Sequence, residues 1–370
     1  MIGKIRQKKS YTFSKVELNK QDIYNLQTSI IGFMGILGVI FIHSNNIGAY
    51  GLKFENGILS GVIGIIEIVI IKLAAMANSY FFMISGYHFY YGISKEKIKG
   101  KLHRRIKTLV LPYLIAVCLS IIYYFMISII PGLMERLGMP LISWSPQLIV
   151  CQVFNPTFDY PLWFANYLIV FSFFSPVLYW IYNKRRLSYI VLVLLISTNI
   201  FSLVNNSYYN WLSVYYIGGF IGFNTKEFTN GLSVSKINKP RWLVYVVLFA
   251  ITIIMVFEEV FNFSDFASRA YMYISPFVIW EIVERKIQRE NKIIKIRWWM
   301  SITFFVYSYH VFILPVITKI IKMILPNNPI TAILNFVVSP LLTYSILIVI
   351  AKILKLKPML WKLINGGRGN

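Results

Sequence analysis

The sequence predicts an all-α polytopic membrane protein with about ten transmembrane helices. Of its 370 residues, 57% are hydrophobic, and the mean hydropathy is +0.63. No soluble core needs that much apolar sequence. The apolar residues also come in successive runs of about 20, which is the length that an α-helix needs to cross a bilayer. Between these runs, lysine and arginine residues gather in alternate connections, as they do in loops held on the cytoplasmic side.

We expect one membrane domain over residues 27–356, preceded by a basic cytoplasmic segment at 1–26 and followed by a cytoplasmic tail at 357–370. The first apolar run is of full spanning length, and no small-residue cleavage site follows it. It is therefore predicted to be an uncleaved span rather than a signal peptide. The last residues, 365–370, are expected to be frayed.

The apolar stretch 58–91 is longer than one crossing requires. In one arrangement 58–71 is an outer-surface or re-entrant helix and 72–91 is the second span, whereas in the other both halves cross. The positive-inside rule favours the first, because it keeps most of the 37 lysine and arginine residues on one side. It predicts ten spans with both termini in the cytoplasm. The predicted spans are 28–48, 72–91, 108–130, 161–182, 187–204, 208–223, 242–260, 266–283, 298–318 and 330–351.

The formal net charge is +23. In a soluble protein this charge would suggest nucleic acid, but here no soluble basic face is available for a duplex, so nucleic-acid binding is not expected. The basic residues are better explained as loop anchors that meet anionic lipid. Cys118 falls in a predicted span and Cys151 in a predicted loop, so no disulfide is expected.

His43 is the main candidate for chemistry. It lies near the outer end of the first span, directly after an apolar run, and is followed by Ser44, Asn45 and Asn46. An ionisable residue inside a membrane is costly to keep and is a functional candidate by default. We expect the three polar residues after His43 to form the wall of a polar pocket.

The other histidines carry weaker signals. His310 lies deep in the ninth predicted span and must be satisfied by some partner, so structural and functional roles are both open. His88, at the inner end of the second span, is better explained as an interfacial side chain. His103 is better explained as a solvated residue of a basic loop.

The motifs of several enzyme classes are missing from the sequence. It contains no G-x-S-x-G elbow, no H-E-x-x-H, no P-loop and no Cys/His spacing for a metal. A histidine with neutral polar neighbours fits general-base catalysis of transfer to a hydroxyl, because an imidazole can take the hydroxyl proton as the new bond forms. Asn45, Asn46 and Ser85 are candidate donors to the developing oxyanion.

Two further stretches have both a structural and a functional interpretation. The basic cluster at 95–107 anchors the inner side, and it could also bind a phosphate-bearing cytosolic donor such as an acyl-CoA, with Arg104 and Arg105 as the best candidates. The outer loops at 131–160 and 258–268 are rich in aromatic residues. Interfacial aromatic belts explain them best, although aromatic rings also suit stacking against sugars.

Six segments of the chain resemble, in order, those of the acyltransferase-3 family of integral membrane acyltransferases, over about residues 24–350. The segments are GILGVIFIHSN, SYFFMISGYHF, KLHRRIKTLVLPYLI, PLWFANYLIVFSFFSPVLY, YYIGGFIGF and FFVYSYHVFILP. Each is weak alone, and six in order on a ten-span pattern are fairly specific. The residues that carry the resemblance are His43, Phe81, Phe82, Ser85, Gly86, Tyr87, Arg104, Arg105, Pro112, Tyr113, Leu162, Trp163, Phe164, Pro176, Tyr307 and His310.

The resemblance implies ten helices, a cytosolic acyl-CoA donor (usually acetyl-CoA) as a co-substrate with no bound cofactor, and a glycan acceptor at or beyond the membrane. His43 would be the catalytic residue, Arg104 and Arg105 would hold the donor, and Trp163 would orient the acceptor sugar. We expect the auxiliary residues of the polar pocket to be Ser44, Asn45, Asn46, Ser85, Tyr87 and His310. One departure concerns Gly32, where many members carry an arginine eleven residues before the histidine.

The expected function is therefore O-acylation, with acetyl as the expected group, of a surface polysaccharide such as a capsule or exopolysaccharide, or of its lipid-linked precursor. The expected location is the bacterial cytoplasmic membrane. Membrane lipid and proteins of polysaccharide assembly are the other candidate partners. A non-enzymatic carrier or exporter of a lipid-linked glycan is the alternative, but it needs a continuous polar path and two access states, of which the sequence shows little.

Overall fold

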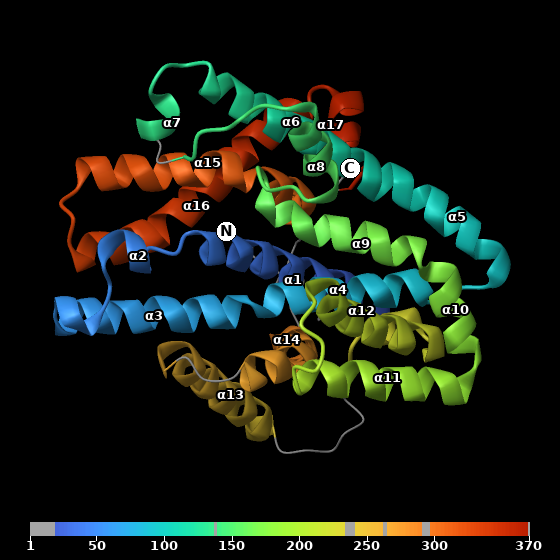
Figure 1. The fold of residues 1–370 in the computed structure, drawn as a ribbon. Coiled ribbons are helices and arrows are strands. Elements are labelled where there is room, and N and C mark those ends of the chain that lie inside the picture. Colours follow the sequence, from blue (N-terminus) through green and yellow to red (C-terminus); the bar gives the residue numbers. More distant parts are fainter. Residues whose placement is uncertain (1–18, 137–138, 234–240, 262–264, 291–296, 369–370) are drawn as a thin grey trace, which may run out of the picture.

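The computed structural model describes residues 19–136, 139–233, 241–261, 265–290 and 297–368, and within them the chain is helical with no strand (Figure 1). The predicted all-α fold of a polytopic membrane protein is confirmed. Short 3₁₀ turns lie at Phe54–Asn56, Tyr160–Leu162, Phe228–Asn230 and Trp298–Met300, and a π-helical turn at Ile106–Val110. The α-helices are α1 (Lys20–His43), α2 (Ile47–Tyr50), α3 (Ile58–Ala74), α4 (Met76–Tyr90), α5 (Lys95–Arg105), α6 (Leu111–Ser128), α7 (Leu133–Arg136), α8 (Pro146–Phe154), α9 (Trp163–Phe173), α10 (Ser175–Asn183), α11 (Arg185–Ile200), α12 (Ser207–Asn224), α13 (Arg241–Phe261), α14 (Phe266–Glu290), α15 (Thr303–Ile324), α16 (Pro329–Leu354) and α17 (Pro358–Asn365).

Five helical stretches in the described part of the chain are long and apolar enough to cross a membrane. A sixth is obtained if α9 and α10, which meet at an angle of 57°, form one bent span. Helices also occupy the remaining predicted spans, but α11 is short and α14 carries several charged residues. The count of ten spans and the cytoplasmic termini therefore stay predictions.

The long apolar stretch 58–91 forms a nearly continuous helix. α3 ends at Ala74 and α4 begins at Met76, and the two together count as one candidate span over Ile58–Tyr90. At 1.5 Å per residue this helix is roughly 50 Å long, which exceeds the hydrocarbon thickness of a bilayer. The segment 58–71 is thus the extension of the second span. It is neither a separate surface helix nor a crossing of its own.

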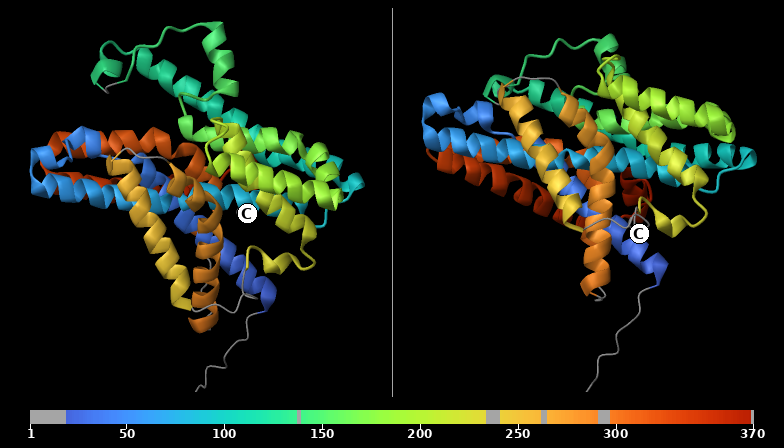
Figure 2. Two further views of the ribbon diagram at one scale, coloured as in Figure 1. Left: turned by 60° about the horizontal axis from the view of Figure 1, so that its bottom comes forward. Right: turned by 90° about the horizontal axis from the view of Figure 1, so that it is seen from below.

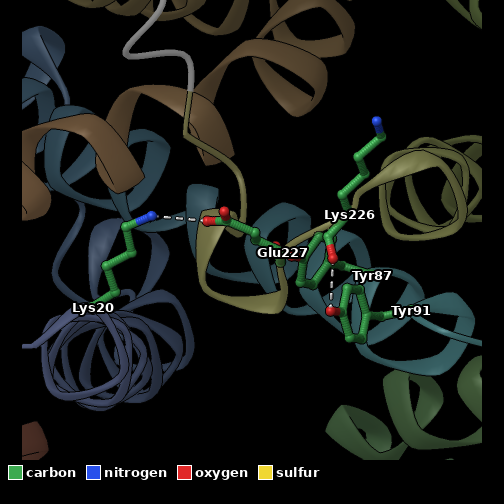
Figure 3. A network of polar contacts seen from close by, with 5 residues as sticks. All are labelled: Lys20, Tyr87, Tyr91, Lys226 and Glu227. Carbon is green, nitrogen blue, oxygen red and sulfur yellow. Dashed lines mark hydrogen bonds and ion pairs between the residues drawn. The ribbon is translucent and has the colours of Figure 1, made fainter.

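Segments predicted to face the cytoplasm gather at one end of the bundle, which we call the inner end. Lys20 forms an ion pair of 2.9 Å with Glu227, and the Tyr91 hydroxyl donates to the Lys226 carbonyl at 3.1 Å (Figure 3). At the opposite end, which we call the outer end, the Lys322 ammonium donates to the Ala49 carbonyl at 2.7 Å. The segments that close the two ends thus come from distant parts of the sequence.

α4 and α12 pack with their backbones in close contact, because glycines lie on the facing sides. A Cβ atom on Gly218 would lie 1.8 Å from the Met83 carbonyl oxygen, and one on Gly86 would lie 2.2 Å from the Tyr215 carbonyl oxygen. Small residues allow this approach between membrane helices. α13 and α14 form a second layer that packs against α3 and α4 (Figures 1 and 2).

Two local expectations differ from the structure. Cys151 lies in α8 rather than in a loop, since Ser145 caps the start of this helix and Pro146 occupies its first turn. The segment expected to be frayed is ordered through Arg368, because α17 packs against α6, α15 and α16 and buries Trp361 and Asn365.

Candidate active site

His43 is the last residue of α1 and lies at the outer end of the bundle. Its Nδ1 atom forms a hydrogen bond of 2.5 Å with the Tyr160 hydroxyl, and the two rings meet edge to face at 88°. The imidazole of His310 stacks on it, with ring centroids 5.3 Å apart and planes 19° apart. The structure therefore brings together the two histidines that the sequence placed in separate spans.

The tautomer of His310 follows from its contacts. Its Nδ1 lies 2.8 Å from the Tyr307 carbonyl and 3.2 Å from the Val306 carbonyl. Both neighbours are acceptors, so Nδ1 carries the proton and Nε2 presents a lone pair. Nε2 is buried and has no hydrogen-bond partner among the described residues. The site thus contains a hydrogen-bond acceptor of fixed orientation, Nε2 of His310, on the ring that stacks against His43.

Tyr160 belongs to this site and Asp159 directly precedes it in the chain, and the sequence reasoning missed both. They lie in the connection between α8 and α9, which folds inward so that Asp159 is fully buried. Neither carboxyl oxygen of Asp159 has a partner in the described chain, and burial raises the pKa of this group well above its ordinary value. The sequence feature that could have revealed these two residues is an acidic residue beside an aromatic one at the end of the outer loop 131–160.

Tyr307 holds this connection in place. Its hydroxyl donates to the Pro161 carbonyl and accepts a hydrogen bond of 3.2 Å from the Ala165 amide. Because Tyr307 lies one turn before His310 on α15, the same helix fixes both the stacked histidine and the segment that carries Tyr160. The end of the 131–160 loop thus reaches His43, and Phe158 packs on Tyr124 behind it.

The polar residues after His43 bond mainly to backbone groups. Ser44 donates to the Phe41 carbonyl at 3.0 Å, and the Asn45 side chain accepts from the Ile47 amide at 2.9 Å. Asn46 donates through its backbone amide to Glu67 at 3.0 Å and through its side chain to the Ala332 carbonyl at 3.2 Å. These bonds close the end of α1 and attach it to α3 and α16, and none of them is made to His43.

Ser85 and Tyr87 lie toward the inner end. A Cβ on Gly35 of α1 would meet the ring of Phe81 on α4, and Ser85 lies one turn farther inward, so roughly 18 Å separate it from His43 along the helices. Tyr87 donates to the Phe228 carbonyl at 2.6 Å and holds the loop after α12. The structure therefore does not bring either residue to the imidazole.

The two arginines of the basic cluster have different surroundings. Arg105 turns inward, where its Nη2 donates to the Ser85 hydroxyl at 3.1 Å and its guanidinium lies 5.6 Å from the Phe89 ring. Arg104 is exposed on the other face of α5. Of the two arginines, therefore, only Arg105 points into the bundle, and Lys101 of the same cluster also turns inward, where its ammonium donates to the Tyr91 carbonyl at 2.9 Å.

Trp163 lies one turn beyond Tyr160, at the start of α9. It packs in an aromatic cluster, with centroid distances of 5.2 Å to Tyr167, 5.5 Å to Trp211 and 5.9 Å to Phe82. Trp163 thus follows Tyr160, the residue that bonds His43, by three positions in the chain.

The family model described as an acyltransferase domain, Acyl_transf_3, matches residues 33–352 of this chain. The matched part contains His43, Tyr160 and His310, together with most of the helical bundle. Comparison with curated proteins and with solved structures finds no significant match. Since the family model covers most of the sequence, and the helices include several of spanning length, the chain belongs to the acyltransferase-3 family and is a multi-pass membrane acyltransferase.

Proposed function

We propose that this protein is an O-acyltransferase that moves an acyl group, with acetyl as the expected group, from a cytosolic acyl-CoA to a hydroxyl of a surface polysaccharide or its lipid-linked precursor. The observation that carries the proposal is the imidazole of His43 at the outer end, held by Tyr160 and stacked on His310. The proposed location is the bacterial cytoplasmic membrane.

The hydrogen bond with Tyr160 engages Nδ1 of His43, so Nε2 is the ring nitrogen left to face the acceptor. When Nδ1–H of His43 donates to the Tyr160 oxygen, the Nε2 lone pair is free to accept a proton. Nε2 then takes the proton of the acceptor hydroxyl while its oxygen bonds the thioester carbonyl carbon. The tetrahedral intermediate collapses, the C–S bond breaks, and the imidazolium returns its proton to the CoA thiolate. The products are an acyl ester and free CoA.

His310 and Asp159 suit the binding of a polyhydroxylated acceptor. The Nε2 lone pair of His310 can accept a hydrogen bond from a second hydroxyl of the sugar. Burial raises the pKa of Asp159, and in its protonated form this carboxyl group can both donate and accept. Trp163 and its aromatic neighbours would orient the sugar ring. These contacts would give the buried polar atoms of the site the partners that they lack.

The donor would bind from the inner end. Arg105, the inward residue of the basic cluster, suits a phosphate because its guanidinium matches phosphate geometry. Ser85, its hydrogen-bond partner, lies roughly 18 Å from His43. An extended pantetheine arm is suited to this separation, so the nucleotide phosphates can stay at the inner end while the thioester reaches His43. Arg104 can add only a more exposed positive charge.

The test is to compare the surface glycan of cells with and without this protein. If the protein is an acyltransferase, cells that lack it are expected to make a glycan without the ester-linked acyl groups, while the polymer still reaches the surface. If the protein is instead a carrier or exporter of a lipid-linked glycan, cells that lack it are expected to lose the surface polymer. Deletion that leaves the acyl content of the glycan unchanged would contradict the proposed transfer reaction.

Replacing Tyr160 with phenylalanine is expected to lower acyl transfer by about 10- to 100-fold. The ring would still pack against His43, but the hydrogen bond that orients the imidazole would be lost, and orientation of a general base contributes strongly to its efficiency. Transfer of labelled acetyl from acetyl-CoA in isolated membranes measures this effect. Tyr91→Phe, which loses only a contact of the inner end, is the matched control.

A further inference from the structure

The segment 361–368 contains three buried polar atoms that have no hydrogen-bond partner among the described residues. They are the indole Nε1 of Trp361, the side-chain oxygen of Asn365 and the Nη1 of Arg368. Two of the three are donors. Buried polar groups are normally paired, so three unpaired ones in one short segment need an explanation such as a ligand.

The backbone of this segment is shaped to return Arg368 to the bundle. Gly366 and Gly367 both have positive φ, at 64° and 70°, and end α17 in a tight turn. A Cβ on Gly366 would lie 2.5 Å from the Thr108 carbonyl oxygen, so only glycine fits against the π-helical turn before α6. The turn is therefore built into the sequence and is not a loose end.

Arg368 lies against the start of α15 and within electrostatic range of Arg105. Its guanidinium carbon is 4.1 Å from the centroid of the Phe304 ring. Burial, with a smaller contribution from the charge of Arg105, lowers the pKa of Arg368 to about 9. No carboxylate in the described chain forms an ion pair with either arginine. Two partly desolvated cations without a counter-charge are costly, and an anion between them would remove that cost.

We propose that Arg368 and Arg105 together form a binding site for a phosphate-bearing anion at the inner end, which the segment 361–368 closes. Arginine suits this ligand because its guanidinium donates two parallel hydrogen bonds to phosphate oxygens. The phosphates come either from the nucleotide of the acyl-CoA, in which case the inference rests on the proposed function, or from a lipid headgroup. Arg368 lies outside the matched residues 33–352, so the family model does not assign it.

The position of Gly32 supports this placement. A Cβ on Gly32 would meet the Thr303 methyl group at an ordinary distance of 3.8 Å, so this side of α1 faces the start of α15. Phe304, whose ring contacts the Arg368 guanidinium, directly follows Thr303 in the chain. Gly32 and Arg368 therefore both border the region beside the start of α15.

The experiment uses the full chain in nanodiscs of phosphatidylcholine, with CoA as the probe. Arg368→Gln is expected to weaken CoA binding by about tenfold or more, because a charge-assisted contact with phosphate is lost. Lys362→Gln, which removes an exposed charge from the same segment, is the matched control and is expected to change binding by less than about twofold. Thermal melting of each variant shows whether it is folded.

Nanodiscs that contain phosphatidylglycerol distinguish the two sources of phosphate. If a lipid headgroup occupies the site, this lipid should raise the melting temperature of the wild type but not of Arg368→Gln, and CoA should bind both alike. A folded Arg368→Gln variant that matches the wild type in CoA affinity and in its response to the lipid would overturn the proposal. If Arg368→Gln behaves in this way but the wild type still transfers acyl groups, only the Arg368 proposal fails and the proposed function stands. If Arg368 holds phosphate but no acyl transfer occurs, only the proposed function fails.

A second variant tests the location of the site. Gly32→Arg combined with Arg368→Gln is expected to restore part of the CoA affinity, since the residue 32 position has room for a side chain and faces the same region. A folded double variant that binds CoA no better than Arg368→Gln alone would contradict the placement of the phosphate beside the start of α15.

Discussion

Replacing His43 with alanine is expected to lower acyl transfer by about 10²- to 10⁴-fold, the range that a general base contributes. The substitution removes the ring that bonds Tyr160 at 2.5 Å and that faces His310 at 5.3 Å. Binding of CoA should be nearly unchanged, because the proposed phosphate contacts lie roughly 18 Å away toward the inner end. The measurement is transfer of labelled acetyl from acetyl-CoA to glycan in membranes with equal amounts of each variant.

His103→Ala is the control for this prediction, because His103 is exposed on α5 and far from the site. It is expected to keep wild-type transfer. His310→Ala should fall between the two if its Nε2 only positions the acceptor. A His43→Ala protein that acylates the glycan at the wild-type rate would show that another group takes the hydroxyl proton, and His310, with its free lone pair, would be the first candidate.

Replacing Gly218 with alanine is expected to destabilise the protein by about 3 kcal/mol or more. The added Cβ would lie 1.8 Å from the Met83 carbonyl oxygen, which is a backbone atom of α4 and cannot rotate away. α4 and α12 would have to separate, and Phe82 of α4 stacks on Trp211 of α12 across the same interface. Melting temperature and the yield of monodisperse protein in detergent measure the effect.

Gly100→Ala is the matched control, because this glycine lies in α5 with open space around its Cβ position. Alanine is the better helix former by up to about 1 kcal/mol, so this variant is expected to be as stable as the wild type or slightly more so. Equal melting temperatures for Gly218→Ala and Gly100→Ala would mean that α4 and α12 are not in backbone contact.

The sequence by itself determined the features that depend on local hydropathy and composition. Apolar runs fixed the all-helical membrane fold, because a backbone in lipid must satisfy its hydrogen bonds within each helix. The same patterns singled out His43, a polar residue at the end of an apolar run, and the ordered segments that resemble the acyltransferase-3 family were confirmed by the family model. Long-range contacts were not needed for any of these conclusions.

Only the tertiary structure decided which side chains meet. Tyr160 bonds His43 across 117 residues of sequence, and nothing in its own hydropathy marks it as a partner. Ser85 has suitable chemistry but lies on the inner half of α4, because α1 and α4 run antiparallel. Arg368 was expected in a frayed segment, but a two-glycine turn folds it back against Phe304. The reason is physical: a sequence pattern reports how one helix meets lipid or water, whereas a site depends on how several helices are oriented against one another.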